Sequence, residues 1–126
     1  MKKIGSYLFL AGALIFALIL AYIFLNAKQK NNSDNQNTIL FYGDSCPHCA
    51  EVEKYITDNN IKEKVIFVEK EVYKNADNAK LLQEKAKRCE IKDADIGVPF
   101  LWLPSGNCYM GNDDIIKIFN DKINEK

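Results

Sequence analysis

Short apolar runs alternate with amphipathic stretches beyond residue 38, and this alternation constrains the fold more than any other feature. Four runs have the length and composition of strands: residues 38–42, 65–68, 100–103 and 108–110. Three stretches place apolar side chains at helical spacing: residues 47–60, 76–89 and 112–123. The resulting order, β-α-β-α-β-β-α, predicts an α/β sandwich in which helices cover one sheet.

The connections between these elements predict how the strands pair. A helix links the first two strands, so they should be parallel with a right-handed crossover. The turn formers of residues 104–107, PSGN, link the last two strands, which should make an antiparallel hairpin. Asn112 is expected to cap the final helix.

The segment before residue 38 has a different character. Residues 4–25 carry no charge, and a helix of this length, rising about 1.5 Å per residue, would span the hydrocarbon core of a membrane. A cleaved signal peptide is the alternative, because Lys2 and Lys3 form a basic start, although its apolar part usually has about 7–15 residues. We expect a membrane anchor at residues 1–27, and a polar linker at residues 28–37.

Charge predicts the orientation and excludes one class of partner. Lys2 and Lys3 favour a cytoplasmic N-terminus, which places the domain outside the cytoplasm in a single-pass arrangement. There the four cysteines are compatible with disulfide chemistry. Beyond residue 27 the chain has all 17 acidic residues but only 15 of the 17 Lys and Arg, which gives this part a net charge of −2. No basic surface for nucleic acid is therefore predicted.

The tetrapeptide Cys46-Pro47-His48-Cys49 lies where a strand gives way to a helix. Pro47 is tolerated in a first helical turn because that turn lacks a partner for its N–H. Unpaired N–H groups and the helix dipole favour the thiolate of Cys46, which is the form that attacks a disulfide. His48 adds a partial positive charge or a donor, and Cys49 can donate to the thiolate and later close the disulfide.

Three features, in this order, resemble the thioredoxin superfamily: CxxC opening a helix at Cys46, Val98-Pro99 before the third strand, and a Gly-Asn-Asp-Asp turn at residues 111–114. The short layout is most similar to glutaredoxins, whereas CPHC is the active-site tetrapeptide of DsbA-type oxidases. The resemblance implies a thioredoxin-like β-α-β-α-β-β-α domain at residues 38–126, preceded by one transmembrane helix.

The same resemblance implies roles for individual residues. Cys46 would be an exposed nucleophile and Cys49 a buried resolving thiol, with Pro47 and His48 completing the catalytic tetrapeptide. Pro99 would be a cis-proline beside them, and the backbone of Val98 would pair with an extended substrate.

The implied function is a membrane-anchored thiol-disulfide oxidoreductase that acts on protein or peptide thiols and disulfides and exchanges electrons with an unidentified redox partner. Residues 4–25 would contact the membrane. No cofactor is expected, because the two sulfurs carry the electrons.

Other interpretations of the cysteines stay open. Cys46 and Cys49 could form a plain structural bridge or be core thiols, although a bridge that closes so small a loop contributes little stability. With His48 they could also serve a redox-inert or metal-handling module for Cu(I) or Zn, although a closed zinc site needs four ligands. No metal ligand is therefore assigned.

The remaining cysteines, Cys89 and Cys108, each fit core burial, because Cys89 extends an apolar helix stripe and Cys108 lies in a strand. If Cys46 pairs with Cys49, the other possible bridge joins Cys89 to Cys108 as a structural disulfide.

Overall fold

The computed structural model of the chain describes residues 2–125, and the side chains of residues 9–25 and 34–125. It divides into two compact units, residues 1–36 and 37–126. The first consists of helix α1, Lys2–Gln36. The second contains, in order, β1 (Ile39–Tyr42), α2 (Pro47–Asp58), α3 (Ile61–Lys64), β2 (Val68–Glu71), α4 (Ala76–Arg88), the 3-10 turn η1 (Asp93–Asp95), β3 (Phe100–Trp102), β4 (Cys108–Met110) and α5 (Asn112–Asn124).

Helix α1 corrects the prediction of a membrane anchor. Across residues 2–125, no helix combines the length and the apolar character that a membrane crossing requires. The side chains of residues 4–8 lie outside the described ones. The expected transmembrane helix, and with it the expected single-pass membrane location, is therefore wrong.

The polar segment after the apolar stretch also differs from expectation. We expected residues 28–37 to form a flexible spacer, because they contain no apolar side chain. In the structure, α1 runs through this segment to Gln36, and the second unit begins at Asn37.

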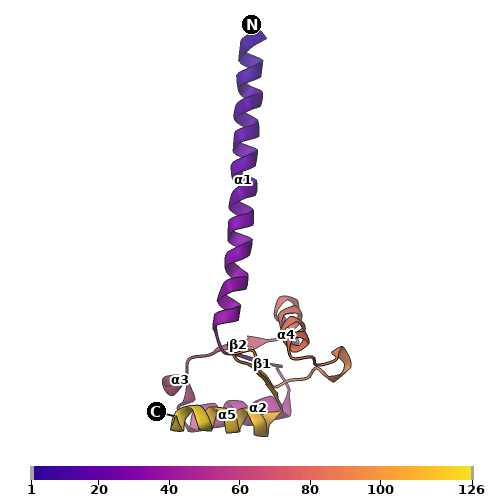
Figure 1. Ribbon diagram of the computed structural model, residues 1–126. Coiled ribbons are helices and arrows are strands. Elements are labelled where there is room, and N and C mark those ends of the chain that lie inside the picture. The colour runs from indigo at the N-terminus through magenta and orange to yellow at the C-terminus, as the bar shows by residue number, and fades with distance from the viewer. Residues whose placement is uncertain (1, 126) are drawn as a thin grey trace. The chain divides into compact units, whose positions relative to one another are not determined.

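The second unit is a small α/β domain built on a mixed sheet of four strands in the order β2-β1-β3-β4. Strand β1 runs parallel to β2 and antiparallel to β3, and β4 is antiparallel to β3. The expected parallel pair and the expected hairpin are both confirmed. Figure 1 shows α2 and α5 side by side on one face of the sheet and α4 on the other.

The face of the sheet toward α2 and α5 carries the larger core. Alternate side chains of a strand point to opposite faces, so Leu40 and Leu101 turn to this side. They pack with Val52, Ile56, Ile61, Leu103, Ile115 and Phe119, all of which are buried. The helical spacing of the apolar residues on α2 and α5 places them on the faces that cover the sheet.

The opposite face packs against α4. The remaining side chains of β1 and β3 point to this face and form a second buried core with Leu82 and Ala86 of α4. They are Ile39, Phe41, Phe100 and Trp102. Helix α4 begins where the Asn75 side chain accepts a hydrogen bond from the Asn78 N–H, and its last turn is basic, which suits the negative end of a helix dipole.

Three local predictions need correction. The second strand begins at Val68 rather than at residue 65, because the short helix α3 ends at Lys64 and residues 65–67 connect it to the strand without joining the sheet. Strand β2 lies at the edge of the sheet and is not buried on both faces as expected, and Ile66 beside it is 90% exposed. Finally, Gly111 rather than Asn112 is the N-cap of α5, and the Asn112 amide instead donates to the Glu51 carboxylate on α2.

Candidate active site

A disulfide joins Cys46 and Cys49 at the start of α2, with their Cα atoms 5.2 Å apart. Cys46 is the N-cap of the helix, and Pro47 occupies the first helical turn, as the sequence indicated. A proline there leaves no hydrogen bond unmade, since the first N–H groups of a helix have no partner within it. The two cysteines are thus one helical turn apart at its positively polarised end.

The turn between β1 and α2 places Cys46 at this helix end. The Cys46 N–H donates to the carbonyl oxygen of Gly43 at 3.2 Å, which closes a tight turn. Ser45 has a positive φ of 69°, a backbone conformation that non-glycine residues adopt infrequently. The chain therefore reverses sharply at the carboxyl end of β1 and enters the helix directly.

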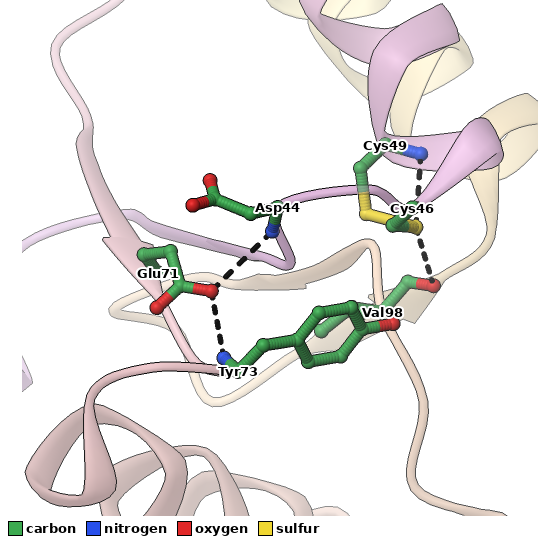
Figure 2. Close-up of a disulfide and its surroundings, with 6 residues drawn as sticks. All are labelled: Asp44, Cys46, Cys49, Glu71, Tyr73 and Val98. Carbon is green, nitrogen blue, oxygen red and sulfur yellow. Dashed lines mark hydrogen bonds between the residues drawn. A yellow bond between two sulfur atoms is a disulfide. The ribbon is translucent and has the colours of Figure 1, made fainter.

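The Cys46 sulfur contacts two backbone groups. It accepts a hydrogen bond from the Cys49 N–H at 3.2 Å, and it lies 3.6 Å from the carbonyl oxygen of Val98 (Figure 2). The Val98–Pro99 peptide bond is cis. The structure thus brings together Cys46, Cys49, Val98 and Pro99, four of the six residues that the family resemblance implied for the site.

Burial does not separate the two cysteines in the way we expected. In the disulfide form Cys46 is 8% exposed and Cys49 is 6% exposed. The expected contrast between an exposed nucleophile and a buried partner is absent in this state. A shallow hollow nevertheless opens over the disulfide, lined by residues 42–47 together with Cys49, Ala50 and Glu53.

A second, smaller cavity of about 80 Å³ lies on the Cys49 side. It is lined by Leu40, Tyr42, Cys49, Val52, Glu53, Glu69 and Pro99. Pro99 and Cys49 therefore border one cavity, which links the cis-proline segment to the buried side of the disulfide. His48, in contrast, is exposed on the first turn of α2.

Glu71 is a neighbour of the site that the sequence analysis missed. It is the last residue of β2 and pairs with Tyr42, the last residue of β1. Its carboxylate accepts hydrogen bonds from three backbone N–H groups, those of Asp44, Tyr73 and Lys74 (the first two drawn in Figure 2). No local pattern could have indicated this role, because the site residue Asp44 is 27 positions away.

The electrostatics of this neighbour follow from its hydrogen bonds. Desolvation raises the pKa of Glu71, but the hydrogen bonds from the N–H groups of Lys74, Tyr73 and Asp44 together outweigh it, so the pKa is lowered. Lys74 also forms an ion pair with Asp44 at 2.5 Å, and this hydrogen bond raises the pKa of Lys74. The turn before Cys46 is therefore bordered by paired charges.

The second pair of cysteines is also bridged. Cys89, the C-cap of α4, forms a disulfide with Cys108 on β4, and their Cα atoms are 6.2 Å apart. The bridge that the sequence left open is thus present. Near it, the Lys85 ammonium lies 4.7 Å above the ring of the buried Trp102, a cation–π geometry.

Among the described residues, no group of three or more His, Cys, Asp or Glu side chains converges as a set of metal ligands. Comparison with known proteins adds no assignment, since no family model and no curated protein matches the chain.

Proposed function

We propose that the chain is a thiol-disulfide oxidoreductase of the thioredoxin superfamily, which its sequence resembles. The observation that carries the proposal is the position of the Cys46–Cys49 disulfide, at a helix N-terminus and against the carbonyl oxygen of Val98. A bridge with a purely structural role has no need of this position, because closing so small a loop adds little stability.

Two physical features support Cys46 as the sulfur that exchanges. The Cys49 N–H already donates to it, and the same donor would stabilise a thiolate. The helix dipole acts in the same direction, because its positive end lies at the N-terminus. Thiolate stabilisation of this kind makes Cys46 a good leaving group as well as an attacking group.

The proposed exchange proceeds in two displacements. A substrate thiolate attacks the Cys46 sulfur, the Cys46–Cys49 bond breaks, and Cys49 leaves as a thiolate that takes up a proton. A second thiolate of the substrate then attacks the substrate sulfur of the mixed disulfide and releases Cys46. Two electrons pass from the substrate dithiol to the cysteine pair, and the reverse sequence reduces a substrate disulfide.

The segment around the cis peptide bond supplies the docking surface in this proposal. Val98 is half-buried and its carbonyl oxygen lies beside the Cys46 sulfur. An extended substrate peptide that runs along Val98 brings its own sulfur to Cys46. The substrates are therefore protein or peptide thiols and disulfides, and a further thiol-disulfide pair on a partner restores the starting state.

Turnover by variants of the full chain in which one cysteine, or one pair of cysteines, is replaced by serine tests the proposal. The parent should reduce insulin or oxidise a reduced dithiol peptide, and Cys46→Ser should abolish both reactions. The matched control is the double variant Cys89→Ser/Cys108→Ser, which also removes a disulfide but should keep turnover. Unchanged turnover in Cys46→Ser would contradict the proposal. An inactive parent that binds Cu(I) stoichiometrically would favour the metal-handling module instead.

A further inference from the structure

The turn that delivers Cys46 to its helix is held by a residue from a different strand. Strands β1 and β2 are parallel, so their carboxyl ends meet at one edge of the sheet. The chain turns sharply after each strand, at residues 43–45 after β1 and at residues 72–74 after β2. The Glu71 carboxylate lies between these two turns and binds to both.

The hydrogen bonds of Glu71 are divided between its two oxygens. Oε1 accepts from the Asp44 N–H at 3.3 Å and from the Tyr73 N–H at 2.7 Å, and Oε2 accepts from the Lys74 N–H at 2.8 Å. Hydrogen bonds to an ionised carboxylate are stronger than those between neutral groups. A single side chain thus satisfies three backbone donors, one of them in the turn that precedes Cys46.

Two further contacts join the same turns independently of Glu71. The Lys74 ammonium pairs with the Asp44 carboxylate at 2.5 Å. Gly43 faces the Tyr73 ring so closely that a Cβ added at position 43 would overlap it. The two turns therefore pack as one unit, and the path of residues 43–45 depends on residues 71–74.

Displacement of this turn would move the Cys46 sulfur. The Gly43 carbonyl accepts from the Cys46 N–H, so Cys46 follows the turn. Its sulfur has two close backbone neighbours, the Cys49 N–H and the Val98 carbonyl, at 3.2 and 3.6 Å. A shift of about 1 Å at a reacting group can lower a rate about 100-fold.

We propose that Glu71 is a positioning residue for Cys46: it fixes the turn of residues 43–45 so that the Cys46 sulfur stays at the N-terminus of α2 and beside Val98. This inference rests on the proposed exchange function for its catalytic consequence. Its structural claim, that Glu71 controls the environment of the Cys46 sulfur, is independent of turnover.

The test measures the Cys46 thiol itself in the reduced full chain. Its rate of alkylation by iodoacetamide, followed at Cys46 by mass spectrometry across a pH series, gives the pH midpoint of the thiol. In Glu71→Ala the pH midpoint should rise, because the Cys46 sulfur moves away from the Cys49 N–H and from the positive N-terminus of α2, which both stabilise the thiolate. Simple loss of a nearby negative charge would lower the midpoint instead, since it favours the thiolate. The sign therefore separates positioning from plain electrostatics.

Other charged groups near the turn stay constant in this comparison: Asp44 and Lys74 in the two turns, His48 on α2, and Glu53 in the hollow. The matched control is Glu84→Ala, which removes a carboxylate that pairs with Arg88 on α4 and should leave the midpoint unchanged. Glu71→Gln keeps the shape and one acceptor oxygen, so it should fold and give a smaller upward shift.

The two proposals fail in different ways. A midpoint that is unchanged or lower in both Glu71 variants would overturn the positioning role, whatever the parent's turnover. An inactive parent whose midpoint still rises in Glu71→Ala would overturn only the exchange function. Where the parent is active, Glu71→Ala should lower kcat by up to about 100-fold, with a smaller change in KM.

Discussion

The Cys46 sulfur lies 3.6 Å from the carbonyl oxygen of Val98, although the two residues are 52 positions apart in the chain. This contact joins the N-terminus of α2 to the segment that leads into β3. Two parts of the domain therefore meet at the disulfide: the helix that supplies the cysteines, and the segment with Val98 that precedes the interior strand β3.

Substitution of Gly43 should disturb the turn before Cys46. Gly43→Ala places a Cβ in the Tyr73 ring, so either the ring or the turn must shift. We expect a loss of about 1–3 kcal/mol in the free energy of unfolding, measured with urea. When Tyr73→Ala has already removed the ring, adding Gly43→Ala should lower the free energy of unfolding much less than it does in the parent. Gly97→Ala is the matched control, because its nearest neighbour, Met110 Sδ, is at an ordinary 3.8 Å.

Removal of the second disulfide should affect stability and leave exchange intact. The Cys89–Cys108 bridge closes a loop of 19 residues and ties α4 to β4. Its loss should lower the free energy of unfolding by about 3 kcal/mol. Denaturant unfolding of Cys89→Ser/Cys108→Ser under non-reducing conditions measures this. A variant as stable as the parent would show that the bridge adds nothing to the fold.

The Glu71 contacts should make stability depend on acid pH. A carboxyl whose pKa is lower in the folded state stabilises the fold above its unfolded value, near 4.5, and this contribution is lost as pH falls through the folded pKa. The parent should therefore exceed Glu71→Gln in unfolding free energy at pH 7, and the difference should shrink below pH 4.5. A difference that stays constant from pH 7 into the acid range would contradict the assignment.

The larger core should be sensitive at Phe119 and insensitive at Ile66. Phe119 is fully buried and its ring centroid lies 5.0 Å from that of Phe67. Phe119→Ala should cost about 3–5 kcal/mol, because it removes packing and leaves a cavity. Ile66→Ala, at a side chain that is 90% exposed, should change the unfolding free energy by no more than about 0.5 kcal/mol. Equal losses at the two positions would refute the assignment of the core.

Local patterns in the sequence were sufficient to predict much of the domain. The helical spacing of apolar side chains in residues 47–60 predicted α2, and the apolar residues Cys49, Val52 and Ile56 on this helix are buried. The strand at residues 108–110 and its hairpin were also predicted correctly. These features depend on neighbours a few positions away, so periodicity and turn chemistry reveal them.

Features that depend on distant contacts were not predictable in the same way. The apolar run at residues 65–68 predicted a strand, but pairing with β1 begins only at Val68, and the residues between α3 and Val68 stay outside the sheet. The length of α1 depends on how the polar segment continues the helix, which composition alone did not indicate. Glu71 binds backbone N–H groups, and these carry no side-chain signal that a sequence could display.

The most direct test of the central claim is the capture of a mixed disulfide. Cys49→Ser removes the thiol that resolves the intermediate, so the reduced variant mixed with a disulfide-containing peptide should retain one peptide on its chain. Peptide mapping by mass spectrometry then locates the adduct. The account predicts an adduct on Cys46 that disappears in Cys46→Ser/Cys49→Ser; an adduct confined to Cys89 or Cys108, or none at all, would contradict it.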